Sequence, residues 1–70
     1  MPEPIHYTIR VEGHLDESWS EWFTGLRVRC EPGGQSVLYG ALPDQASLHG
    51  VLMRIRDLGL VLVSVERFSP

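Results

Sequence analysis

The side chains best suited to chemistry in this chain are three histidines and one cysteine, and their spacing limits what they can do. The residues are His6, His14, His49 and Cys30. No two of them stand at the i, i+4 spacing by which a helix presents a pair of metal ligands, and no C-x-x-C pair occurs. The sequence therefore predicts no metal site.

Nucleophilic catalysis by Cys30 would require a neighbouring base and a thiol pKa lowered by nearby positive charge. The segment LRVRCE alternates as a strand, so Arg27 and Arg29 are expected on the opposite face from Cys30. A buried, inert thiol is the prediction. The glycines of EPGGQ precede a strand and not a helix, so they offer no phosphate site. We therefore expect no catalytic residue and no cofactor, and a protein that is not an enzyme.

Length and charge limit the possible partners. Seventy residues form one domain at most. A single core of that size contributes about 3–5 kcal/mol or less of net stability. The lone cysteine excludes a disulfide within the chain, so association between copies is the expected supplement. A net charge of −3 without a basic run argues against nucleic acid as a partner.

The opening segment and the longest apolar run of the chain indicate its compartment. The opening MPEPIHY is acidic and proline-rich, unlike a signal peptide. The longest apolar run, LGLVLV, is far shorter than the ~20 residues of a membrane span. We expect a soluble, cytoplasmic protein with a free thiol and no membrane contact.

Hydrophobic periodicity predicts six elements that must position these residues. Residues 5–12 alternate as a strand whose buried face carries Ile5, Tyr7, Ile9 and Val11. Residues 26–31 and 36–42 form a hairpin around EPGGQ. A longer helix begins at the N-cap Asp44 and ends at Gly59, and its apolar positions are Leu48, Val51, Leu52, Ile55 and Leu58. A final strand, LVLVSVERF, closes the pattern.

The stretch SWSEWFTGL concentrates aromatic side chains in one short helix. Its apolar positions, Trp19, Trp22, Phe23 and Leu26, fall on one helical face, with Ser18 or Asp16 as N-cap. Large rings let a short helix cover much of a sheet, so core packing is the preferred interpretation. The alternative is a small-ligand pocket lined by Trp19, Trp22 and Tyr39.

The order strand, helix, strand, strand, helix, strand predicts an α+β fold of the ferredoxin-like βαββαβ split type. It implies a four-stranded antiparallel sheet with two helices on one face and with the first and third strands in the centre. Close packing of the second helix would explain the glycine at position 50 inside it.

The uncovered face of this sheet is the main candidate surface. We expect it to present His6 and Thr8 together with Arg10, Arg27, Arg29, Tyr39 and Arg67, beside apolar positions such as Val37 and Val63. Tyrosine and arginine on apolar ground are typical of protein interfaces, so a homodimer or higher oligomer through the sheet face or edge is preferred, with another protein as a possible partner. An RNA platform is disfavoured because the paired aromatic positions of such sheets are missing.

The segments GHLDESWSEWFTGL, LPDQASLHGVLMRIRDLGL and SVERF resemble a set of short, uncharacterised bacterial proteins. These share a WSxWF segment and a DQAxLHGxLxRIRDLG helix. The resemblance extends over nearly the whole chain and implies a bacterial cytoplasmic setting and a compact α+β fold. It implies no activity and assigns no site residue.

Overall fold

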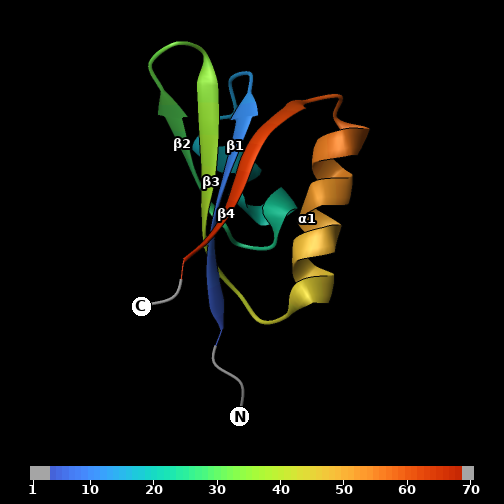
Figure 1. Cartoon of the computed structure of the whole chain (residues 1–70). Coiled ribbons are helices and arrows are strands. Elements are labelled where there is room, and N and C mark those ends of the chain that lie inside the picture. Colours follow the sequence, from blue (N-terminus) through green and yellow to red (C-terminus); the bar gives the residue numbers. More distant parts are fainter. Residues whose placement is uncertain (1–3, 69–70) are drawn as a thin grey trace.

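The computed structural model describes residues 4–68 (Figure 1). The first residues of MPEPIHY and the last two of the chain lie outside this range. The elements follow the predicted order: β1 (Ile5–Glu12), the 3-10 helix η1 (Glu17–Phe23), β2 (Arg27–Glu31), β3 (Gln35–Leu42), α1 (Gln45–Asp57) and β4 (Val61–Phe68).

The four strands form one sheet in the order β2-β3-β1-β4, and every neighbouring pair is antiparallel. The first and third strands are central, as the sequence predicts, and β2 and β4 are the edges. Both helices lie on the same side of the sheet (Figure 1). The α+β class with a four-stranded antiparallel sheet is therefore confirmed.

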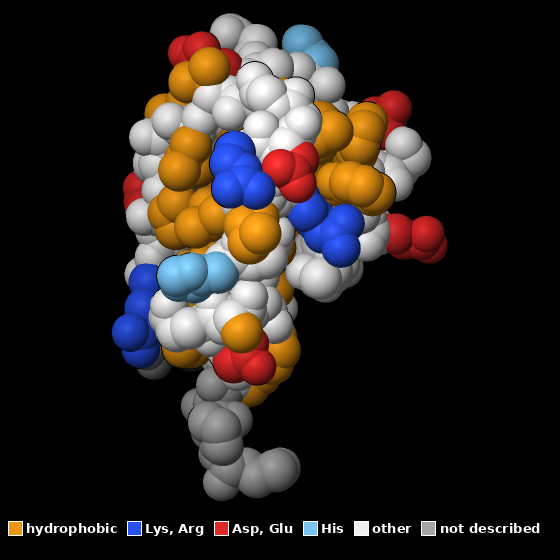
Figure 2. All heavy atoms as spheres, turned by 90° about the vertical axis from the view of Figure 1, so that its right-hand side faces the viewer, with side chains coloured by type: hydrophobic (Ala, Val, Ile, Leu, Met, Phe, Trp, Pro, Cys, Tyr) orange, Lys and Arg blue, Asp and Glu red, His pale blue; other side chains and the backbone are white. Residues whose placement is uncertain are grey.

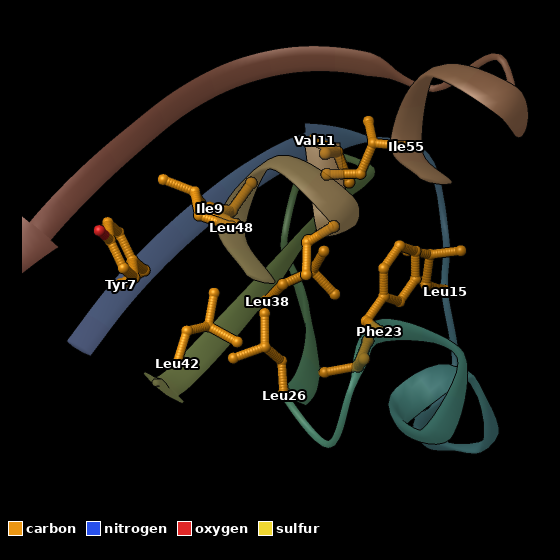
Figure 3. Close-up of a cluster of buried hydrophobic side chains, with 12 residues drawn as sticks. Tyr7, Ile9, Val11, Leu15, Phe23, Leu26, Leu38, Leu42, Leu48 and Ile55 are labelled. Atoms are coloured by element: carbon orange, nitrogen blue, oxygen red, sulfur yellow. The ribbon is translucent and has the colours of Figure 1, made fainter. Parts of the chain in front are cut away.

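The core lies between this sheet face and the two helices (Figure 3). Alternate residues of β1 and β3 point into it because successive side chains of a strand alternate between faces. Its largest members come from all parts of the chain: Tyr7, Ile9, Val11, Leu15, Phe23, Leu26, Leu38, Leu42, Leu48, Val51 and Ile55. The Tyr7 hydroxyl accepts a hydrogen bond of 2.8 Å from Gln45 Nε2, so the one polar atom of this aromatic group is paired.

Helix α1 follows the sequence prediction at its start and departs from it at two later positions. The Asp44 carboxylate accepts a hydrogen bond from the Ser47 amide at 2.8 Å, which is the expected N-cap. Leu58, predicted to be buried, is exposed because it follows the last helical turn. Gly50 is not explained by close packing, since a Cβ there would meet no atom within 4 Å.

The first helix differs from the prediction in type and in what it buries. It is a 3-10 helix capped by Asp16, whose carboxylate accepts from the Ser18 amide at 2.9 Å. Three residues per turn place Trp19 and Trp22 in one column and not on an α-helical face with Phe23. Phe23 alone is buried, Trp19 packs partly against the core, and Trp22 is 45% exposed. The prediction that both indoles form core is therefore wrong for Trp22.

Candidate functional site

The sheet face opposite the helices brings together four residues that the sequence nominated. Directly opposed residues of an antiparallel pair share a face. Arg10 of β1 and Arg29 of β2 both oppose Val37 of β3, and Arg27 opposes Tyr39. Arg10, Arg27, Arg29 and Tyr39 therefore lie on one surface, as predicted.

Ionic and aromatic contacts involve two of the three arginines of this face, Arg10 and Arg29. Glu31 Oε1 lies 3.2 Å from Arg10 Nη1 and 3.3 Å from Arg29 Nη2. The Arg29 guanidinium also lies 5.5 Å from the centre of the Tyr39 ring. Val37 is only 1% exposed, because the aliphatic stems of the arginines on either side can cover it. The prediction of exposed apolar surface at Val37 is wrong.

Arg67 was predicted to lie on this surface but lies on the other side of the sheet. It opposes Tyr7, whose ring is in the core, so Arg67 lies on the helix side of β4. The cause is a bulge: Arg10 opposes Ser64 while Val11 opposes Leu62, which leaves Val63 without a partner. One extra residue reverses the alternation of a strand. The sequence pattern carries no signal of this bulge, so the face of Arg67 was predicted incorrectly.

Strand β4 exposes an unusual amount of apolar surface for an edge strand. Five of its eight residues are large hydrophobic groups that are 38–62% exposed, namely Val61, Leu62, Val63, Val65 and Phe68. In its sheet it pairs only with β1, so its outer backbone edge has no neighbouring strand. Figure 2, which looks onto the side of α1, shows surface hydrophobic side chains in two separate groups, to the left and to the right.

The second candidate site is an open groove between η1 and α1. The ring centres of Trp19 and Trp22 are 6.3 Å apart and their planes meet at 87°. The Arg54 guanidinium of α1 lies 4.7 Å from the centre of the Trp22 ring. The groove has a volume of about 470 Å³ and is lined by Ser18, Trp19, Glu21, Trp22 and Arg54.

Tyr39 does not join the tryptophans, so the predicted three-aromatic pocket does not form. It lines a different hollow of about 300 Å³ with Glu17, Ser20, Arg27 and Val28. Tyr39 projects from the face opposite the helices, and this hollow, at edge strand β2, brings it beside Glu17 and Ser20 of η1 but not beside the tryptophans. The position of Tyr39 agrees with the prediction that it lies on the uncovered face, and disagrees with the alternative that it shares a pocket with Trp19 and Trp22.

The three histidines and the cysteine stay apart. His6, His14 and His49 are exposed and belong to β1, the following loop and α1. In residues 4–68, no group of three or more His, Cys, Asp or Glu residues is placed to hold a metal ion. Cys30 is exposed and not buried as predicted, and its thiol donates to the Leu15 carbonyl oxygen at 3.1 Å. It lies near the end of edge strand β2.

Sequence reasoning missed Arg54 and Glu21 as groove residues. In the sequence, Arg54 falls on the polar face of the second helix and Glu21 is the last residue of the possible capping box SWSE, so neither was nominated as a site residue. Their meeting depends on how η1 and α1 lie relative to each other, and no local pattern encodes that distance. The one available signal in the sequence was that Glu21, a charged residue, stands between the only two tryptophans of the chain.

These features define a two-layer α+β domain with an apolar sheet edge and an aromatic groove. The chain belongs to the family described as Domain of unknown function (DUF8691), whose model matches residues 6–66. That match extends from β1 to β4 and so includes both helices. No curated protein and no solved structure matches the chain. Within the described range, neither helix has the length and apolar character needed to span a membrane.

Proposed function

We propose that this protein is an interaction module without catalytic activity, and that two copies pair through β4. The observation that carries the proposal is the free edge of β4, with its five exposed hydrophobic side chains. An exposed edge strand presents unpaired N–H and C=O groups that a further strand can satisfy. Antiparallel pairing of β4 with its own copy would extend two four-stranded sheets into one of eight strands.

The edge carries only part of the protection that edge strands usually have. Natural edge strands are commonly protected by lysine, proline, inward-pointing charge or a β-bulge, and β4 has only the last two, in Arg67 on its helix side and the bulge at Val63. The chain contains no lysine, and β4 contains no proline. Its two charged residues, Glu66 and Arg67, have opposite signs and leave the strand without net charge. A two-fold pairing therefore meets no excess of like charge.

Pairing through the other candidate surface is less favourable. A symmetric contact between two copies of the sheet face would bring together two clusters of three arginines, Arg10, Arg27 and Arg29, with one carboxylate, Glu31, in each cluster to offset them. Like charges that meet directly destabilise a contact. Val37, the apolar residue that would have favoured this contact, is already covered. The edge is therefore preferred over the face, and a second copy over an unrelated partner, because a two-fold axis matches one apolar strand to an identical one.

The finer assignments are part of the same proposal. The strand order β2-β3-β1-β4 and the two helices on one side support a ferredoxin-like split βαββαβ plan in which a 3-10 helix replaces the first α-helix. The resemblance to bacterial proteins with a WSxWF segment and the single free thiol of Cys30 support a bacterial cytoplasmic setting.

Sedimentation velocity at micromolar concentration tests the proposal. The wild-type chain is expected to sediment as a dimer, and Val63→Lys as a monomer. Val63 is 45% exposed and lies at the bulge, so lysine there is compatible with the folded protomer. Circular dichroism of the variant should match that of the wild type.

A matched lysine substitution separates the edge from the face. Ala41 is an exposed residue of β3 on the side opposite the helices, next to His6 of β1. Ala41→Lys should leave the dimer intact if copies pair through β4, and should dissociate it if they pair through the sheet face. A wild-type chain that sediments as a strict monomer would overturn the proposal of a homodimer altogether.

A further inference from the structure

The groove between η1 and α1 has chemistry of its own, independent of pairing through β4. We propose that it binds the zwitterionic head and the apolar side chain of a free α-amino acid, preferably an aromatic one. The proposal rests on three features that meet in one hollow of about 470 Å³: a right-angled pair of indoles, an unpaired guanidinium and a carboxylate.

Arg54 supplies the anion-binding group. Its guanidinium lies over the Trp22 ring and makes no hydrogen bond or ion pair with any other residue in the described range. Arg56, by contrast, lies on the same helix and is paired with Asp57 at 3.2 Å. An arginine stacked on an aromatic ring keeps its in-plane N–H donors free, and these match the two oxygens of a carboxylate.

Glu21 gives the groove its second charge and decides the class of ligand. An acid alone would be attracted to Arg54 but would lie beside the Glu21 carboxylate. An amine alone would be attracted to Glu21 but would lie beside the Arg54 guanidinium. A ligand that carries a carboxylate and an ammonium group on one carbon satisfies both side chains. Opposite charges on the lining of one groove therefore favour an α-amino acid over a simple anion or cation.

The two tryptophans form the apolar part of the site. Trp19 packs against the core and fixes one wall, while Trp22 stands 45% exposed beside it. Planes at 87° form a corner in which one flat or branched side chain can contact both rings. Aromatic pairs contribute about 0.5–1.5 kcal/mol beyond their buried area, which favours a ring in this position. Without a ligand, the exposed part of the Trp22 ring would contribute little to the stability of the fold.

The chain is well suited to a direct test, because its only two tryptophans both line the groove. Indole fluorescence and the two indole N–H signals in an NMR spectrum therefore report on this site and, through Trp19, on the adjoining core. The probe is L-phenylalanine, which carries no indole. We expect a saturable fluorescence change and a shift of both indole signals.

Blocked forms of the probe identify the groups that are recognised. N-acetylphenylalanine lacks the ammonium group, phenylalaninamide lacks the carboxylate, and N-acetylphenylalaninamide lacks both. Each single block should weaken binding roughly tenfold, as expected for the loss of one charge-assisted hydrogen bond. The same pattern separates a free amino acid from the terminus of a peptide, which has only one of the two charges. Equal binding of the doubly blocked form would overturn the proposal.

Variants assign each charge to its residue. Arg54→Met keeps an aliphatic chain near Trp22 and should weaken phenylalanine binding but not phenylalaninamide binding. Glu21→Gln should weaken phenylalanine binding but not N-acetylphenylalanine binding, because it removes the partner of the ammonium group. Arg56→Met is the matched control, because Arg56 is exposed on the same helix and is not part of the groove. Its binding should equal that of the wild type.

The outcomes also separate this site from the proposed dimer. Absence of any wild-type response to phenylalanine, in fluorescence and in NMR, would overturn the ligand site and leave the sedimentation result unaffected. Val63→Lys, which should be monomeric, is expected to bind phenylalanine as the wild type does. If Arg56→Met abolished the response to phenylalanine as fully as Arg54→Met, that result would also contradict the assigned roles.

Discussion

The Ser36 hydroxyl accepts a hydrogen bond from the Leu15 amide at 2.9 Å, and it does so in the interior of the domain. The same oxygen donates its proton to the Gly13 carbonyl at 2.6 Å. One buried serine of β3 thus satisfies two backbone groups of the loop that joins β1 to η1. The position of η1, and with it the groove, depends on this anchor.

Ser36→Ala should lower the free energy of unfolding by about 1–3 kcal/mol, because it leaves buried backbone groups without partners. Urea unfolding followed by tryptophan fluorescence measures the loss. Ser64→Ala is the matched control, since Ser64 is a strand serine whose hydroxyl makes no hydrogen bond to another described residue. Equal stability of Ser36→Ala and the wild type would contradict the anchoring role.

Phe23 and Trp22 are neighbours in sequence with opposite environments. Phe23→Ala removes a fully buried ring and should cost about 3–5 kcal/mol, which is as much as the whole net stability expected of a core of this size, so the variant should be largely unfolded at low urea. Trp22→Ala removes a half-exposed ring and should cost clearly less. Urea unfolding followed by far-ultraviolet circular dichroism compares the two variants without relying on tryptophan. A larger loss for Trp22→Ala would mean that the indole is part of the core after all.

Gly40 allows β3 to pass close to the chain that leads into β2. Its φ is +145°, and a Cβ there would lie 3.2 Å from Leu26 Cδ2. Gly40→Ala should therefore destabilise the fold by about 1–3 kcal/mol through backbone strain and crowding. Gly50→Ala is the informative comparison: no atom lies within 4 Å of its Cβ, and alanine favours a helix by about 1 kcal/mol. Thermal unfolding should place the two variants on opposite sides of the wild type.

The N-cap of α1 makes stability depend on acidity. The hydrogen bond from the Ser47 amide lowers the pKa of Asp44 below its ordinary value of 3.8, and the Ser47 side chain adds to this. A group whose pKa is lower in the folded state stabilises the fold above its unfolded pKa, and the contribution is lost as pH falls through the folded value. The cap is therefore fully effective near neutrality and weakens below about pH 4.

Asp44→Asn tests this dependence, because asparagine caps a helix about as well but does not titrate. Near neutrality its urea midpoint should stay close to that of the wild type. Between pH 5 and pH 2, values that bracket roughly the titration of a carboxyl, its midpoint should fall less steeply than that of the wild type. Parallel curves would show that Asp44 makes no pH-dependent contribution.

The fold was largely accessible from periodicity. Alternation gave the buried face of β1, and the spacing of Leu48, Val51 and Ile55 gave the buried face of α1. The central position of β1 and β3 followed from the element order and was confirmed. Features that depend on one inserted residue or on helix type were not accessible: the bulge at Val63 reverses the face of Arg67, and the 3-10 geometry exposes Trp22.

The candidate surfaces were predicted less completely for a related reason. The arginines and Tyr39 of the sheet face lie within one hairpin and its neighbour, so local alternation placed them together. The groove joins two helices that are distant in sequence, and its charged residues became visible only with the tertiary arrangement. The apolar character of the last strand was evident from its residues, LVLVSVERF. Its position at the edge of the sheet became known only from the strand order.

The pairing of β1 with β4 has a consequence for the order in which the chain acquires its structure. The first strand finds one of its two neighbours in the last strand, with His6 opposite Phe68. Contacts of such long sequence separation form slowly, because the entropy of closing the intervening loop must be overcome first. On the ribosome the hairpin of β2 and β3 emerges well before β4. One side of β1 therefore stays unpaired until the translation of this domain is complete.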